Sequence, residues 1–112
     1  MNVGTTDGKI FTSKFYPPDE SWTRKNAWWI QIPVDRLKTD NFSHIHLLCQ
    51  TSPNKNDFHY LKVPAEYFLK HLSEFKFIGK GKINLFLSAE SNNLFEDERG
   101  TGRVNFDLFL IK

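Results

Sequence analysis

The sequence predicts a single α+β domain with a mostly antiparallel sheet of four or five strands and one main helix, at about residues 65–75, packed on one face. Short apolar runs separated by turn-forming clusters recur along the 112-residue chain, and one stretch has a helical apolar period. Eleven Phe, three Trp and three Tyr supply the volume for a core. Because only one clear helical crossover is present, α+β is favoured over a doubly wound sheet.

The first third of the chain predicts two strands. Residues 9–16 alternate weakly between apolar and polar side chains and end at Pro17-Pro18, whereas residues 1–8 are expected to be flexible. A polar link leads to a strand at about 27–32. The proline that follows starts a short helical turn over 33–37.

The middle of the chain predicts an antiparallel hairpin. Two apolar runs, 44–49 and 58–63, flank the segment 51–57, which is dense in turn-forming residues around Pro53-Asn54. We therefore expect the two runs to pair across this loop.

The last part of the chain supplies the helix and the closing elements. The helix at 65–75 ends before Gly79-Lys80-Gly81, and a strand follows at 82–89. Residues 90–103 form a charged loop, and 104–111 are apolar enough for a closing helix or strand. No repeat or linker divides the chain, so residues 1–112 are expected to form one domain, compatible with a module of a longer protein.

Two adjacent tryptophans in the 27–32 strand must point to opposite sides of the sheet. Trp28 shares a face with Ile30 and Ile32, whereas Trp29 shares the other face with Gln31. The alternation predicts a buried Trp28 and a more exposed Trp29. A large aromatic on the face away from the core indicates either a binding site or a second packing surface.

The second face of the hairpin gathers aromatic, cationic and polar side chains. If the Trp29 strand joins the same sheet, aromatics there could stack on bases while cations contact phosphates. The alternative is that a helix covers this face and the side chains only pack. The residues concerned are Trp29, His44, His46, Phe58, Tyr60 and Lys62.

Four further cations are candidates for phosphate contacts. Arg24 and Lys25 lie in the polar link before Trp28, and Arg99 and Arg103 lie on a glycine-containing loop. Arginine can contact a phosphate or carboxylate through two hydrogen bonds. For Arg99 and Arg103, pairing with the neighbouring acidic residues is the alternative.

The residue types do not favour catalysis, a metal or a cofactor. His44 and His46 point the same way, but Cys49 has the wrong parity to join them and His59 faces the opposite side. Cys49 lies in an apolar strand, where a buried, inert thiol is expected. No nucleophile elbow or complete phosphate-binding loop is present. The sequence leans against an enzyme.

Composition sets broad limits on partners and location. The formal charge of +2 permits contact with a polyanion without indicating a strongly basic coat. One cysteine excludes an internal disulfide, and neither a signal peptide nor a membrane-spanning stretch is apparent. We therefore expect a cytoplasmic protein with no membrane partner.

Three segments, Trp28–Pro33, Ile45–Cys49 and Phe58–Pro64, resemble strands of restriction-endonuclease-like proteins, a likeness that covers about residues 27–78. The catalytic members of that superfamily carry the PD-(D/E)XK motif. Here the positions spaced like its last two functional residues are Tyr60 and Lys62, so the metal-binding acid is missing. The resemblance implies an inactive or accessory part of a DNA-restriction system.

The leading hypothesis is a non-enzymatic nucleic-acid-binding module, with DNA as the expected partner, in a restriction or defence protein that could include further domains. The alternative is a protein-interaction domain that docks a partner on the same aromatic face. A metal-dependent nuclease is the third hypothesis, and the missing acid argues against it.

Overall fold

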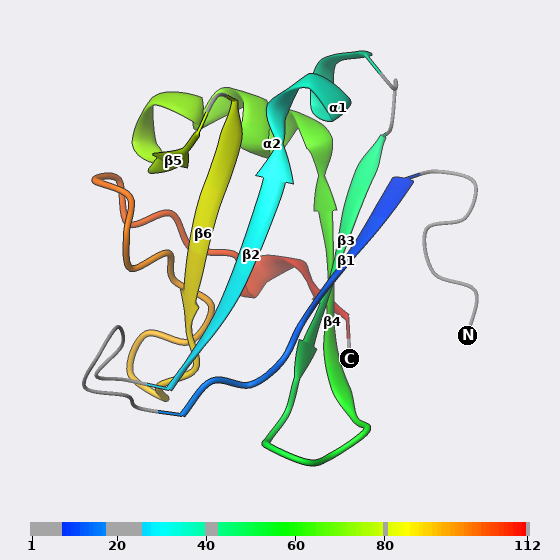
Figure 1. Ribbon diagram of the computed structural model, residues 1–112, viewed down its shortest axis with the longest axis vertical. Coiled ribbons are helices and arrows are strands. Elements are labelled where there is room, and N and C mark those ends of the chain that lie inside the picture. Colours follow the sequence, from blue (N-terminus) through cyan, green and yellow to red (C-terminus); the bar gives the residue numbers. More distant parts are fainter. Residues whose placement is uncertain (1–7, 18–25, 40–42, 80, 112) are drawn as a thin grey trace.

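The structure is a computed structural model that describes residues 8–17, 26–39, 43–79 and 81–111. It confirms the α+β class and the mostly antiparallel pairing. The strands divide between two sheets, however, where the sequence predicted one sheet of four or five strands. A four-stranded sheet has the order β1-β3-β4-β7, and a three-stranded sheet has the order β2-β6-β5 (Figure 1).

The strands are β1 (Gly8–Ser13), β2 (Ala27–Pro33), β3 (His44–Gln50), β4 (Phe58–Pro64), β5 (Phe77–Ile78), β6 (Lys82–Ser88) and β7 (Leu110–Ile111). The helices are α1 (Val34–Thr39) and α2 (Ala65–Lys70), and the 3₁₀ turns are η1 (Leu72–Glu74) and η2 (Asp107–Phe109). Gly8 already belongs to β1, and the rest of the segment expected to be flexible lies outside the described residues.

The predicted hairpin is confirmed. β3 and β4 pair antiparallel, with Leu47 opposite Leu61 and Ile45 opposite Val63. Their loop turns at Asn54, whose φ of 64° lies in the left-handed region that asparagine tolerates better than most residues. Sequence periodicity therefore located this element correctly.

β2 does not join the hairpin sheet. The open side of β3 pairs with β1, in parallel, and the open side of β4 pairs with β7. β2 instead pairs antiparallel with β6 along its whole length, with Trp29 opposite Phe86. The shared face of Trp29 and the hairpin residues, considered from the sequence, does not form.

The helix predicted at 65–75 is shorter than expected, whereas the helical turn predicted at 33–37 is present as α1 (Val34–Thr39). Helix α2 ends at Lys70, and η1 follows after His71, whose φ of −108° departs from helical geometry. This change of direction lets Phe75 enter the core, where its ring lies 5.9 Å from that of Phe68 and 6.2 Å from that of Phe106. The closing segment contains both a 3₁₀ turn and a two-residue strand.

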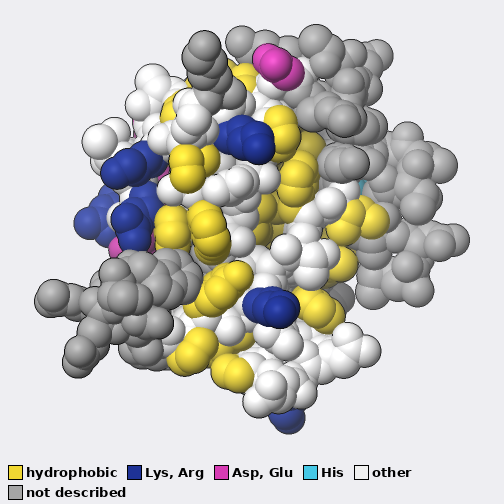
Figure 2. Space-filling model, in the orientation of Figure 1, with side chains coloured by type: hydrophobic (Ala, Val, Ile, Leu, Met, Phe, Trp, Pro, Cys, Tyr) yellow, Lys and Arg dark blue, Asp and Glu magenta, His cyan; other side chains and the backbone are white. Residues whose placement is uncertain are grey.

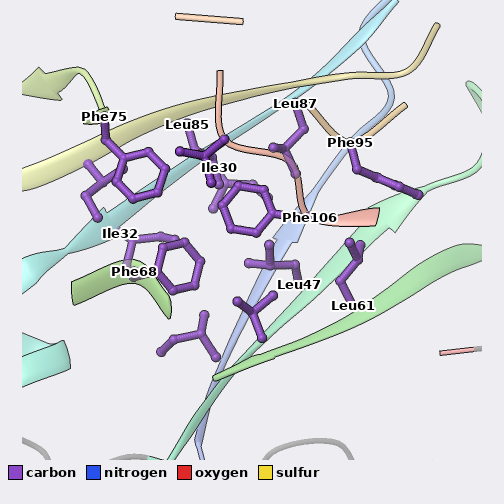
Figure 3. Packing of buried hydrophobic residues seen from close by; sticks show 14 of the residues in the cluster. Ile30, Ile32, Leu47, Leu61, Phe68, Phe75, Leu85, Leu87, Phe95 and Phe106 are labelled. Atoms are coloured by element: carbon purple, nitrogen blue, oxygen red, sulfur yellow. The ribbon is translucent and has the colours of Figure 1, made fainter. Parts of the chain in front are cut away.

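Buried hydrophobic side chains form one cluster between the inner faces of the two sheets. Figure 3 shows the rings of Phe68, Phe75 and Phe106 among aliphatic side chains from both sheets. Cys49 belongs to this cluster, and burial raises the pKa of its thiol, so it remains a neutral packing group. This confirms the buried, inert cysteine predicted from the sequence.

Trp28 joins the two sheets. Its side chain is 1% exposed, whereas that of Trp29 is 37% exposed, as strand alternation predicted. The Trp28 Nε1–H donates to the backbone oxygen of Gln50 at 2.7 Å, which links β2 to β3. The indole also stacks on Phe95, with ring centroids 5.2 Å apart and an interplanar angle of 16°.

The two tryptophans are expected to differ strongly in their effect on stability. Trp28→Ala should lower the free energy of unfolding by about 3–5 kcal/mol, since it opens a cavity and removes a buried hydrogen bond. Trp29→Ala should lower it by about 1–2 kcal/mol, because it removes the hydrogen bond to Asn84 and the ring contact with Phe86. Urea denaturation of both variants tests this, and equal losses would contradict the assignment of the two faces.

Candidate functional site

The outer face of the β2–β6–β5 sheet carries a cluster of aromatic and polar side chains. Trp29 and Phe86 are cross-strand partners whose rings lie 5.7 Å apart and 17° from parallel. We call the surface formed by Tyr16, Trp29, Asn84, Phe86 and Arg99 the aromatic face. Figure 2, in the orientation of Figure 1, shows hydrophobic side chains gathered over β2 and β6, with Lys and Arg side chains at the edge beside β6.

The Trp29 side chain has a defined orientation although it is exposed. Its Nε1–H donates to Asn84 Oδ1 at 2.5 Å, and its backbone N–H donates to Ser13 Oγ at 3.0 Å. Phe86 supports one side of the indole. Together these contacts hold the indole in one geometry, so little conformational entropy is left to lose when a ligand stacks on it.

Arg99 brings a positive charge to the aromatic face. Its guanidinium carbon lies 4.3 Å from the centroid of the Phe86 ring, which is cation–π geometry. The planar guanidinium can donate several hydrogen bonds in one plane. The ring contact places the guanidinium over the Phe86 ring.

Asp97 holds the loop that carries Arg99. Its side chain is buried, and its two carboxylate oxygens accept the backbone N–H groups of Phe86, Arg99 and Gly100 at 3.3, 3.3 and 3.1 Å. A Cβ at position 100 would lie 2.2 Å from the backbone oxygen of Glu74, so only glycine fits there. The loop is thereby fixed against β6.

Burial is the main influence on the Asp97 carboxyl and raises its pKa above the usual value. Its hydrogen bonds from Arg99, Phe86 and Gly100 lower the pKa but do not outweigh burial, and the charge of Glu98 raises it further. The ionised form is therefore disfavoured by folding.

An open pocket of about 480 Å³ is lined by the residues of the aromatic face. A smaller hollow of about 350 Å³ lies beyond the Gln31–Asn84 pair and is lined by Gln31, Ile78, Gly79 and Lys82. The first pocket has a size typical of small-molecule sites, with aromatic walls and a few polar groups. Such a pocket suits a flat heterocycle.

The hairpin residues predicted as part of the site lie on the outer face of the other sheet. His46 is 1% exposed, its Nδ1 is hydrogen-bonded to the Tyr60 hydroxyl at 2.8 Å, and the two rings lie 5.7 Å apart. His46 is therefore a buried packing group. His44, Phe58, Tyr60 and Lys62 share this face, and Phe58 is 36% exposed.

The four cations predicted to contact phosphate do not form one cluster in the described structure. Arg103 pairs with Glu98 at 2.7 Å and lies 3.8 Å from Glu96, which is the acid-pairing alternative. Arg24 and Lys25 lie outside the described residues. Of the predicted site residues, the structure brings Trp29 and Arg99 together.

The described part of the chain contains neither a metal-binding cluster nor a membrane-spanning helix. No group of three or more His, Cys, Asp or Glu side chains there could hold a metal ion. Within the same ranges, no helix has the length and apolar character needed to cross a membrane.

Sequence reasoning missed Asn84 and Phe86, although a signal was present. Both alternate with Ile83, Leu85 and Leu87 in a strand, so they must face away from the core. Only the pairing of β2 with β6 places them beside Trp29, and that pairing joins segments far apart in the chain.

Comparisons with protein-family models, with curated proteins and with solved structures found no match for this chain. The resemblance to restriction-endonuclease-like proteins therefore stays a prediction.

The raised pKa of Asp97 predicts a pH-dependent stability. The folded state holds the Asp97 proton more tightly than the unfolded state does, so its stabilising effect is complete below the unfolded pKa and is lost as the pH rises through the folded pKa. Asp97→Asn removes this titration. As the pH rises, the unfolding free energy of the parent should therefore fall relative to that of Asp97→Asn.

Denaturation of both proteins across the acidic range measures this difference. A shift in favour of the parent with rising pH would show that the backbone N–H groups outweigh burial, contrary to our account.

Proposed function

We propose that this protein is a non-enzymatic DNA-binding module that holds an unpaired base on the aromatic face. The observation that carries the proposal is the exposed Trp29 indole, fixed by Asn84 and Phe86 beside the Arg99 guanidinium. Every base has a π-face, so a fixed indole can stack on an unpaired base whatever the sequence. A cation beside the ring can contact the neighbouring phosphate.

Charge on the same sheet supports a polyanion as the ligand. Lys82 is exposed in the hollow that adjoins the aromatic face, and the whole chain has a formal charge of +2. Arg99 lines the larger pocket and Lys82 lines the smaller hollow on the same face of the sheet. Cations spaced along one face in this way can contact successive phosphates of a bound strand.

The wider setting is part of the same proposal. The sequence resemblance to restriction-endonuclease-like proteins supports a recognition role within a DNA-restriction or defence system. A single cysteine that is buried and unpaired is typical of a reducing compartment, which supports the cytoplasm.

A protein partner is the second candidate for this surface. Ile78 is 40% exposed and lines the smaller hollow, and together with Trp29 it could anchor a protein through a few apolar contacts. Binding through such anchors depends weakly on ionic strength, whereas phosphate contacts weaken steeply as salt increases.

Removal of the exposed indole should weaken DNA binding. Trp29→Ala should raise the dissociation constant for single-stranded DNA by an amount equivalent to roughly 1–3 kcal/mol of lost stacking. Phe58→Ala is the matched control, because Phe58 is equally exposed but lies on the outer face of the other sheet. Fluorescence anisotropy of a labelled oligonucleotide measures both. An equal loss in the two variants, or a loss only in Phe58→Ala, would contradict the proposed surface.

Two arginines on one loop allow a matched test of the phosphate contact. Arg99→Ala should weaken binding and flatten the plot of log binding constant against log salt by roughly 0.7, as expected for one lost phosphate contact to a single strand. Arg103→Ala should leave the slope unchanged, because Arg103 is already paired with Glu98. Titrations at several salt concentrations measure the slopes, and identical slopes for parent and Arg99→Ala would remove Arg99 from the interface.

A further inference from the structure

The side-chain amide of Asn84 lines the pocket of the aromatic face. Asn84 lies in the middle of β6, is 9% exposed and lines the pocket. An indole N–H can only donate a hydrogen bond, so the atom of Asn84 that lies 2.5 Å from Trp29 Nε1 must be the oxygen. The amide orientation is thus fixed by chemistry, and Nδ2 points elsewhere.

Asn84 Nδ2 is a donor without an acceptor among the described residues. It makes no hydrogen bond to any described residue, and none of the fully buried side-chain N or O atoms in the described part of the chain lacks a partner. Nδ2 is therefore reached by solvent, at the wall of the pocket. A ligand that displaces this solvent has to offer an acceptor, or the donor is left unsatisfied.

Arg99, which also lines the pocket, can only donate hydrogen bonds. Arg99 has five N–H donors and no acceptor, and its carbon lies over the Phe86 ring. A ligand edge rich in acceptors therefore matches the pocket, and an edge that carries an amino group does not.

We infer that Asn84 makes the pocket select keto bases over amino bases. This inference rests on the proposed function and adds a specificity-determining residue to it. The Hoogsteen edge of a 6-keto purine offers the O6 and N7 acceptors, whereas adenine offers N7 and an N6 amino group. With adenine in the pocket, the amino group would meet the Asn84 amino group donor to donor.

The experiment uses short single strands that carry one base among abasic sites, so that only that base can stack. Hypoxanthine and adenine are the matched pair, because on the Hoogsteen edge they differ only in the group at position 6. The parent protein should bind the hypoxanthine strand roughly three- to tenfold more tightly than the adenine strand. This is the difference expected for one neutral hydrogen bond that forms with hypoxanthine and cannot form with adenine.

Asn84→Asp should reverse the preference. The variant keeps one oxygen for Trp29 Nε1–H and replaces the free donor by an acceptor, which suits the adenine amino group. The added negative charge weakens the binding of both strands to the same extent. Its effect therefore cancels in the ratio of the two dissociation constants. Gln31→Glu is the control, because Gln31 is the cross-strand partner of Asn84 and lines the neighbouring hollow instead. It should leave the ratio as in the parent.

The outcomes separate this inference from the proposed function. Failure of the parent to bind either strand, with an intact fold, overturns the proposed function and the inference with it. Binding that depends on Trp29 but has a ratio near one overturns the inference alone. If Asn84→Asp does not fold, the ratio in the parent still decides. A change in ratio as large in Gln31→Glu as in Asn84→Asp also overturns the role of Asn84.

Discussion

The burial of Trp28 between the two sheets is the constraint on which the rest of the structure depends. Its indole links β2 to β3 through Gln50 and stacks on Phe95, just before the loop that carries Arg99. With Trp28 in the core, strand alternation leaves Trp29 only the outer face. The position of the exposed indole is therefore a consequence of core packing.

Local features of the fold could be predicted from the sequence, whereas pairings between distant segments could not. The hairpin of β3 and β4 and the opposite faces of Trp28 and Trp29 follow from periodicity and turn chemistry. The pairing of β2 with β6 does not, because a strand pattern states which face is apolar but not which strand lies beside it. For this reason Trp29 was grouped with the hairpin residues.

The candidate site shows the same division. Trp29 and Arg99 could be found as an exposed aromatic and a cation on a loop, but Asn84 and Phe86 became visible only through the register of β2 with β6. The support beneath them is a buried carboxylate, Asp97, that holds three backbone N–H groups although burial disfavours its ionised form. A fixed loop of this kind preorganises the cation over the ring.

The most direct test of the central claim is a two-dimensional ¹H–¹⁵N spectrum of the protein recorded while a single-stranded oligonucleotide is added. The account predicts that the Trp29 indole N–H signal and the amide signals of β6 and Arg99 shift together, while those of Phe58, Tyr60 and Lys62 stay in place. Shifts confined to the β3–β4 face, with the Trp29 indole signal unchanged, would contradict it.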